Sequence, residues 1–97
     1  MTPVEFISPA LAEVADAASY YLERNPEAAA SFLAAIDRAT AIISAHPSIG
    51  RPTEHGARLL TLAEFPFDMV YRALEDRLVV TAIAHHRREP RYWVERL

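Results

Sequence analysis

The sequence contains no cysteine, no lysine and only two glycines. Without cysteine, the chain has no disulfide framework, no thiolate zinc site and no cysteine nucleophile. Two glycines are too few for a glycine-rich phosphate-binding loop. No apolar run approaches the roughly 18 residues of a membrane span, and no basic residue precedes Arg24, so the positive flank of a signal peptide is missing. Residues 1–97 are therefore expected to form a single cytoplasmic domain with no membrane partner.

Charge is distributed unevenly along the chain. The formal net charge is −3, so bulk attraction to nucleic acid is not expected. Residues 1–50 carry two arginines and six acidic residues, whereas residues 51–97 carry eight arginines and seven acidic residues. The exclusive use of arginine has two explanations, a GC-rich coding sequence or a bidentate grip on phosphate and carboxylate groups. Cationic chemistry is expected from the carboxyl half.

Proline marks the boundaries of the predicted helical region. Residues 4–7 are rich in strand formers and predict a short strand. Ser8 is suited to cap a helix, and Pro9 to occupy its first position. Asn25-Pro26 ends this helix and begins a second one, which stops at His46-Pro47, because proline disfavours helical geometry in the residue before it. With almost no linker between them, the two helices are expected to form an antiparallel hairpin.

Helical spacing predicts which side of each helix is buried. On the first helix the expected buried positions are Leu11, Val14, Ala15, Ala18, Tyr21 and Leu22. The expected outward positions on that helix are Glu13, Asp16, Tyr20 and Glu23. On the second helix the expected buried positions are Ala29, Phe32, Leu33, Ile36, Thr40 and Ile43.

The sequence changes character after a loop at residues 46–56, which holds two prolines and both glycines. β-Branched and aromatic residues then predict three strands, at Ala57–Phe65, Phe67–Leu74 and Arg77–His85. Their short connections predict an antiparallel meander, followed by a terminal segment, Arg91–Leu97, that can form a helix. The fold class is therefore expected to be α+β, with the helical hairpin covering one face of the sheet.

A two-residue turn at Glu75-Asp76 would set the register of the last two strands. It pairs Ala73 with Leu78, Tyr71 with Val80 and Met69 with Ala82, which puts an apolar face against the helices. No Asn-Gly or Asp-Gly pins this turn, so a slip of one residue would exchange the two faces. The opposite face is expected to carry Asp68, Val70, Arg72, Leu74, Val79, Thr81, Ile83 and His85.

The stretch of residues 84–96 contains four arginines, two histidines, Tyr92 and Trp93. This composition suits RNA, because arginine neutralises phosphate and aromatic rings stack on bases. It equally suits an acidic protein partner. A structural role stands beside both, in which Trp93 closes the core of a small domain. No metal site is expected, because the adjacent strand residues His85 and His86 point to opposite faces.

Metal-free RNA cleavage is chemically open to such a chain. A base would take the 2′-hydroxyl proton, an acid would protonate the leaving oxygen, and arginine would support the charge of the phosphorane. The candidates are Arg58, Arg72 and Arg88 as phosphate clamps, His85 and His86 as acid or base, and Tyr92 as a proton donor if its pKa is lowered.

Several short patterns appear in order along nearly the whole chain. They are Ala12 to Asp16, Tyr20-Tyr21-Leu22-Glu23, Asn25-Pro26 with Ala29 and Phe32, Ile36 to Ile43, Pro47-x-x-Gly50-x-Pro52, Gly56-x-Arg58, Phe65-Pro66-Phe67-x-x-Val70-Tyr71-Arg72 and Ala82-Ile83-Ala84-His85-x-Arg87-Arg88-x-Pro90-x-Tyr92-Trp93. In this order and spacing the chain resembles the RelE/ParE toxins of bacterial type II toxin–antitoxin and plasmid-stabilisation modules, and its tail is most similar to the ParE side. The fold implied by this resemblance agrees with the elements predicted above.

The toxins that the chain resembles have two activities on one scaffold, so fold alone does not choose between them. ParE-like members arrest growth by binding DNA gyrase. RelE-like members are endoribonucleases that cut messenger RNA at the ribosome. The absence of lysine and the negative net charge favour the ParE-like activity here. A toxin fold with a lost or different activity is the third interpretation.

The resemblance also implies partners, and it implies no cofactor. One partner is a small ParD-like antitoxin, whose disordered tail would fold over the helices and the exposed sheet. The target would be DNA gyrase, with the ribosome and its mRNA as the alternative. The residues expected to contact target or antitoxin are Arg72, His85, Arg87, Arg88, Arg91, Tyr92 and Trp93.

Overall fold

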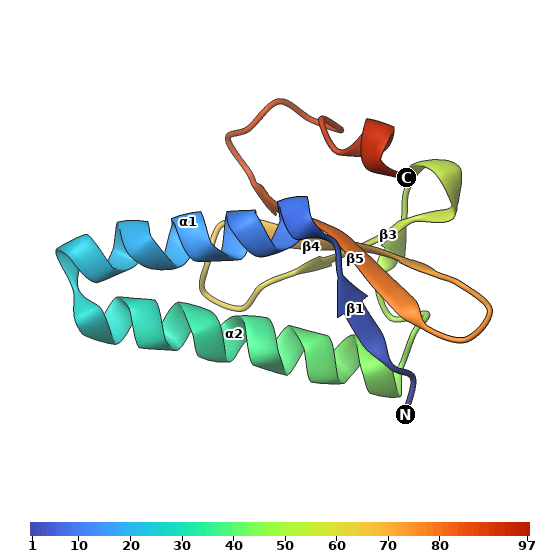
Figure 1. Cartoon of the computed structure of the whole chain (residues 1–97), viewed down its shortest axis with the longest axis horizontal. Coiled ribbons are helices and arrows are strands. Elements are labelled where there is room, and N and C mark those ends of the chain that lie inside the picture. Colours follow the sequence, from blue (N-terminus) through green and yellow to red (C-terminus); the bar gives the residue numbers. More distant parts are fainter.

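A computed structural model describes all residues of the chain, 1–97. The predicted order of strand, two helices and strands is confirmed, and the fold class is α+β (Figure 1). The elements are β1 (Val4–Phe6), α1 (Ser8–Arg24), α2 (Pro26–Ala45), β2 (Arg51–Pro52), a 3₁₀ turn (Glu54–Gly56), β3 (Arg58–Thr61), β4 (Phe67–Ala73), β5 (Leu78–His85) and a last 3₁₀ turn (Val94–Arg96).

The boundary between the helices lies where asparagine and proline predict it. The Asn25 side chain accepts a hydrogen bond from the Glu27 N–H at 2.9 Å, and the Asn25 N–H donates to the Tyr21 carbonyl at 2.7 Å. One residue therefore ends α1 and caps α2. At the other end of α1 the prediction is wrong, because Ser8 is already helical and no side chain caps that terminus.

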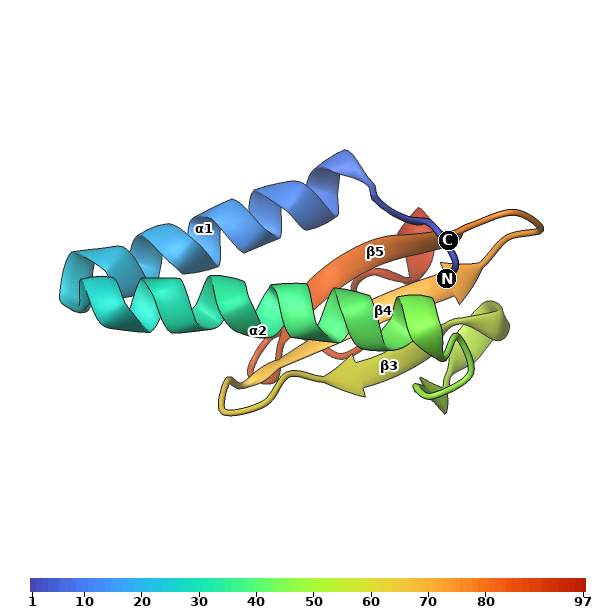
Figure 2. The ribbon, with the colours of Figure 1, turned by 90° about the horizontal axis from the view of Figure 1, so that it is seen from below.

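The strands form one sheet in the order β1-β5-β4-β3-β2. β1 runs parallel to β5, and the remaining neighbours are antiparallel. The hairpin of α1 and α2 lies on one side of this sheet, and its far end extends beyond the strands in both views (Figures 1 and 2). Residues 86–97, which we call the carboxyl-terminal segment, return over the strands on the side away from α2 (Figure 1).

Each face of the sheet has its own apolar cluster. The larger cluster, the helix-side core, joins both helices to the strands, and its fully buried members include Phe32, Ile43, Met69 and Val80. The smaller cluster, the tail-side core, lies under the carboxyl-terminal segment. It consists of Ala57, Val70, Ala82 and Trp93. Trp93 is 4% exposed, so its predicted role in closing the core is confirmed, and the second face is more covered than the sequence suggested.

The buried side of α1 differs from the predicted one. Leu11 is 54% exposed and Leu22 is 57% exposed, whereas Ala10 and Ala17 are buried. Because α1 packs against both α2 and β5, small alanines at the contact allow a closer approach than leucines would. The side of α1 that is buried is therefore rotated from the predicted one, and Glu13, expected to point outward, faces the protein. On α2 the prediction holds for the buried positions Ala29, Phe32, Ile36 and Ile43, but Leu33 is exposed.

A β-bulge in β5 changes the predicted register. The predicted pairs Ala73–Leu78 and Tyr71–Val80 are confirmed. Beyond them the pairing shifts, so that Met69 opposes Ile83 and the predicted pair with Ala82 is wrong. The unpaired residue is Thr81, whose hydroxyl donates to the Val70 carbonyl at 3.3 Å. One extra residue reverses the alternation of side chains, so every later position of β5 points to the other face.

Three other elements also differ from the prediction. The strand expected at Ala57–Phe65 is shorter, because the chain leaves β3 after Thr61 and Glu64 adopts a positive φ of 68°. Arg51–Pro52, expected in a loop, forms a short edge strand beside β3. The expected terminal helix is only the 3₁₀ turn Val94–Arg96.

Helix α2 is long and apolar enough, by length and composition alone, to cross a membrane. The expectation that no segment reaches span length needs this correction, because alanines raise the mean hydropathy of an 18-residue window to 1.3. Its apolar stripe, which includes Phe32, Ile36 and Ile43, is buried in the helix-side core. Burial of an apolar stripe in this manner is typical of a helix that packs against the core of a protein.

Candidate functional site

Arg58 is committed to a structural contact. It stands on β3 opposite Tyr71, and its guanidinium donates to the carbonyls of Ser48 and Gly50 at 3.1 and 2.7 Å. The Tyr71 hydroxyl donates to the Pro47 carbonyl at 2.7 Å and accepts from the Gly50 N–H at 2.9 Å. Arg58 and Tyr71 together therefore hold the loop that follows α2.

Gly50 is required by this close approach. A Cβ at that position would lie 2.8 Å from the Tyr71 hydroxyl oxygen and 3.0 Å from the Arg58 Cβ. Both distances are shorter than normal contacts, so any side chain would push the loop away from the sheet. The glycine thus serves the fold of the loop.

Arg72 and His85 do not share a face of the sheet, which corrects the predicted site. Arg72 alternates with Tyr71 of the helix-side core and so points to the opposite face. Beyond the bulge, His85 points to the same face of the sheet as Ile83, which belongs to the helix-side core. The His85 and Phe67 rings make an edge-to-face contact, with 4.9 Å between their centroids. The His85 Nδ1 atom accepts a hydrogen bond from the Arg87 N–H at 3.0 Å. Thr81 in the bulge is the physical cause of this separation.

His86 belongs to a polar network around Asp68. The His86 Nε2 atom lies 3.2 Å from one Asp68 oxygen, which also accepts a 2.7 Å hydrogen bond from the Thr61 hydroxyl. The Arg51 guanidinium lies 3.6 Å from the other oxygen. Asp68 is partly buried and neutralised by its neighbours, so the network offers no free carboxylate. The sequence placed Asp68 on a polar face but did not predict these partners.

Glu13 on α1 gathers three side chains of the carboxyl-terminal half. Its Oε2 atom accepts from the Tyr92 hydroxyl at 2.7 Å and from Arg88 Nη1 at 3.0 Å. Arg96 binds both carboxylate oxygens, through Nη1 at 2.9 Å and Nη2 at 3.2 Å. We call Glu13, Arg88, Tyr92 and Arg96 the Glu13 cluster. Its Glu13 side chain is only 13% exposed.

Burial and hydrogen bonding shift two pKa values within the Glu13 cluster. Burial alone would raise the pKa of Glu13, but hydrogen bonds from Arg96, Tyr92 and the Ile83 N–H outweigh it and lower the pKa below 4.5. Burial, followed by the hydrogen bond to the Glu13 carboxylate, raises the pKa of Tyr92 to about 12. A tyrosine serving as a proton donor would need a lowered pKa. Tyr92 has the opposite shift.

Sequence reasoning missed the role of Glu13, which was expected to point outward. A weak signal for it exists. Glu13 lies three residues after Ala10 and four before Ala17, and these alanines mark the side of α1 that is buried. Recognising that signal requires knowing that α1 packs on small residues rather than on its leucines.

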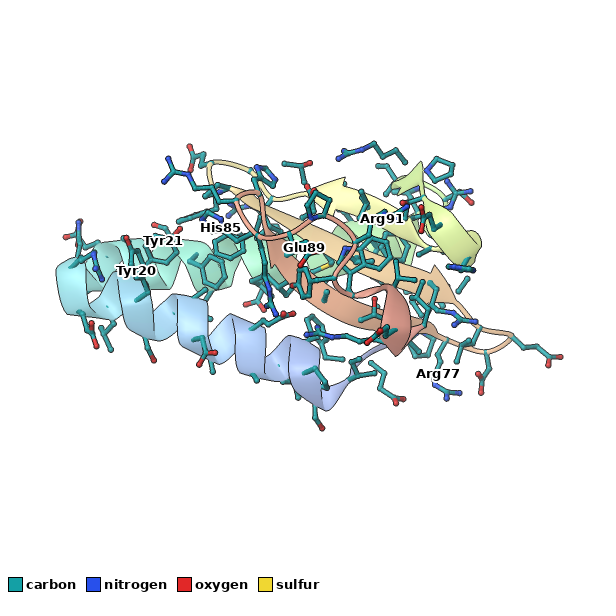
Figure 3. All side chains as sticks on the ribbon, turned by 90° about the horizontal axis from the view of Figure 1, so that it is seen from above. Tyr20, Tyr21, Arg77, His85, Glu89 and Arg91 are labelled. Atoms are coloured by element: carbon teal, nitrogen blue, oxygen red, sulfur yellow. The ribbon has the colours of Figure 1, made fainter.

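A groove of about 380 Å³ lies between β3, β4 and the carboxyl-terminal segment. Its lining includes Arg51, Asp68, His86, Arg88, Arg91 and Tyr92, so it is polar and carries charges of both signs. Figure 3 shows Glu89 and Arg91 on the segment, over the strands. A groove of this kind can take a chain with its own mixture of charged and polar groups.

A second hollow lies beside the carboxyl-terminal half of α1. It measures about 350 Å³, and its lining includes Tyr20, Tyr21, Phe67 and His85. Figure 3 shows Tyr20, Tyr21 and His85 together at this end of the molecule. Tyr20, Tyr21 and Phe67 make an apolar recess with the His85 imidazole on its wall. His85 also lines the groove that Arg91 lines, so the two hollows meet at this residue.

The residues predicted to contact a target differ in how free they are. Arg87 is exposed and its guanidinium pairs with no carboxylate. Arg91 is exposed and pairs with Glu54, while Arg88 stacks on the Tyr92 ring at 3.6 Å and binds Glu13. Trp93 is buried and serves the tail-side core.

No three histidine or carboxylate side chains converge to hold a metal ion anywhere in residues 1–97. The pairs that do form, such as His86 with Asp68, are occupied by hydrogen bonds within the protein.

Comparison with known proteins identifies the family. Residues 4–90 match the family model described as the ParE toxin of the type II toxin–antitoxin system parDE. The chain belongs to the ParE toxin family. This family match ends at Pro90, so Tyr92, Trp93 and Arg96 lie beyond it.

A solved structure supports the same assignment. The chain is similar to a protein of the chromosomal ParDE toxin–antitoxin system from P. aeruginosa, with 25% sequence identity and a TM-score of 0.77. The similarity covers 88% of this chain and 96% of the P. aeruginosa chain. A comparison with curated proteins gave no match. The predicted resemblance to the ParE side of the RelE/ParE toxins is thereby confirmed for this ParE-family chain.

Proposed function

We propose that this ParE-family toxin arrests growth by binding DNA gyrase rather than by cutting RNA. His85, His86, Arg88 and Tyr92 line one groove. The observation that carries the proposal is that the candidate groups are bound to other parts of the protein instead of being free to act on a phosphate. Arg58 holds a loop on the helix side of the sheet, Arg72 points to the other face, and Tyr92 is bound to Glu13. Metal-free RNA cleavage needs a base, an acid and a cation within hydrogen-bond reach of one phosphate. Side chains engaged in this way favour binding over catalysis.

The surface proposed to bind gyrase is the carboxyl-terminal segment with the groove beside it. Arg87 and Arg91 are exposed there, and the groove of about 380 Å³ provides a recess for an anchoring side chain. Arginine suits such a surface, because its planar guanidinium binds carboxylates with directed hydrogen bonds. Arg87, Arg91 and the half-buried Arg72 remain residues proposed for target contact.

The proposal is tested by controlled expression without an antitoxin, followed by parallel assays of gyrase supercoiling and transcript integrity. Inhibited supercoiling with intact transcripts is the expected result. Purified toxin carrying Arg87→Ala should inhibit supercoiling more weakly than the parent, while Arg38→Ala, an exposed change on α2, serves as the matched control. Cut transcripts with unaffected supercoiling would overturn the proposal in favour of a ribosome-dependent ribonuclease. Growth without arrest would overturn both activities.

We further propose that a small ParD-like antitoxin neutralises the toxin by covering its helical hairpin. Leu11, Leu22 and Leu33 are 54%, 57% and 44% exposed on the helices, which gives an amphipathic partner apolar side chains to cover. The similar P. aeruginosa protein comes from a ParDE system. Replacing Leu11 and Leu22 by serine should weaken antitoxin binding in calorimetry and leave supercoiling inhibition unchanged. Unaltered antitoxin affinity would contradict this placement.

A further inference from the structure

The carboxyl-terminal segment keeps its place with little regular structure. Between His86 and Leu97 it forms only the 3₁₀ turn Val94–Arg96. Beside the pairs of His86 with Asp68 and Arg91 with Glu54, two contacts dock it on the rest of the molecule. One is Trp93, buried in the tail-side core, and the other is the binding of Arg88, Tyr92 and Arg96 to Glu13. The second contact joins the last residues of the chain to the first helix.

Glu13 and Arg96 occupy a free edge of the sheet. β1 pairs with β5 only from Leu78 to Val80, so the rest of β5 has no neighbouring strand on that side. The Ile83 N–H donates to the Glu13 carboxylate at 3.0 Å, and the Thr81 carbonyl accepts from Arg96 at 3.0 Å. The ion pair thus satisfies backbone groups that a further strand would otherwise bind.

The same carboxylate closes a loop within the segment. Arg88 lies near its beginning and Arg96 near its end, and both bind Glu13. Arg88 also stacks on the Tyr92 ring at 3.6 Å. Residues 88–96 are therefore joined at one point, and Arg91, at the outer part of this loop, pairs with Glu54. A carboxylate with several charged hydrogen bonds in a partly buried site restricts its partners more than an exposed pair does.

We propose that Glu13 is the positioning residue of the carboxyl-terminal segment. It sets the orientation in which Arg87, Arg91 and the groove meet the target. The inference rests on the proposed function for its target, but the docking itself is independent of that function. Because the ParE family match ends at Pro90, the contacts from Glu13 to Tyr92 and Arg96 are read from this chain's own structure.

Trp93 allows docking to be measured directly. It is the only tryptophan of the chain, it lies within the segment, and it is 4% exposed. In Glu13→Gln the side chain keeps its length and loses its charge. We expect a red-shifted Trp93 emission and a larger acrylamide quenching constant, with an unchanged far-ultraviolet circular dichroism spectrum. Glu23→Gln, an exposed change on α1, is the matched control and should leave emission and quenching as in the parent.

A second variant approaches the contact from the other side. Arg96→Gln should also expose Trp93, and the double variant with Glu13→Gln should shift the emission by less than the sum of the two single shifts, because both remove one contact. These variants remain informative if Glu13→Gln lowers the yield of folded protein. Additive shifts, or an unchanged Trp93 signal in both single variants, would overturn the proposal.

An assay of supercoiling inhibition tests the positioning role of Glu13 and, through the parent toxin, whether gyrase is the target. Loss of the charged hydrogen bonds should raise the toxin concentration needed for half-inhibition by roughly tenfold or more in Glu13→Gln, with no change in Glu23→Gln. Exposed Trp93 with undiminished inhibition would overturn the positioning role. If the parent toxin itself fails to inhibit gyrase, the proposed function fails, and the fluorescence of Trp93 still decides whether Glu13 docks the segment.

Discussion

The helical hairpin and the carboxyl-terminal segment are bound to the same sheet by different forces. The hairpin is held by the helix-side core, in which Phe32 and Ile43 have no exposed surface. The segment is held by Trp93, by the pairs of His86 with Asp68 and Arg91 with Glu54, and above all by one carboxylate that binds two arginines and a tyrosine. Apolar burial is spread over many contacts and has no charge to titrate. A single carboxylate can be neutralised, so we expect the segment to loosen under conditions in which the hairpin stays folded.

The strongest way to break the hairpin is to remove Phe32. Phe32→Ala deletes a fully buried ring that contacts Tyr21, Phe65 and Phe67, and it should lower the free energy of unfolding by about 3–5 kcal/mol. Urea titration followed by circular dichroism measures the loss. Leu33→Ala, next to it and 44% exposed, should change the value by no more than about 0.5 kcal/mol. Equal effects at both positions would contradict the assigned core.

Acid should release the segment before it unfolds the hairpin. The pKa of Glu13 is lowered below 4.5 in the folded protein, so its stabilising contribution is complete above that pH and is lost as the pH falls through the lowered value. Tyr92, which faces the carboxylate, keeps its proton throughout this range, because its pKa is raised to about 12. Trp93 emission should therefore shift below pH 4.5 while the helical signal persists. The transition should be missing from Glu13→Gln, and its survival there would assign it to another group.

Tyr92→Phe should weaken the docking of the segment without abolishing it. The ring can still stack under Arg88, but the 2.7 Å hydrogen bond to Glu13 is lost. A hydrogen bond to a charged group contributes about 1.5–3 kcal/mol, so acrylamide quenching of Trp93 should rise less than in Glu13→Gln. Tyr20→Phe, whose parent side chain is 53% exposed, should leave the quenching unchanged. A larger effect for Tyr92→Phe than for Glu13→Gln would contradict the ranking.

The smallest effect is expected at Arg77, which joins the β4–β5 turn to β1. Its guanidinium lies 3.2 Å from Glu5, and the two side chains are 39% and 62% exposed. Solvent screens such a pair, so Arg77→Ala should cost about 1 kcal/mol or less. Urea titrations at low and high salt measure the change. A large, salt-sensitive loss would show that exposed ion pairs matter here as much as the Glu13 cluster.

The sequence predicted the elements better than the site, and particular residues explain why. Asn25-Pro26 acts locally, so it predicted the helix boundary that the structure has. The Glu75-Asp76 turn also acts locally, and the pairs next to it were predicted correctly. The bulge at Thr81 leaves no turn-like signal, and it was enough to put His85 on the helix side, away from Arg72. Glu13 was expected outside, because leucines were assumed to mark the buried side of α1.

The sequence by itself determined the succession of strands and helices, the turn between the last two strands, and the burial of its one tryptophan. These follow from local backbone preferences and from the cost of leaving a large ring in water. Only the tertiary structure decided which side of α1 is buried, which face His85 occupies and which carboxylate receives Arg96. Those outcomes depend on contacts between residues such as Glu13 and Arg96, which are distant in sequence and meet only when the sheet has formed.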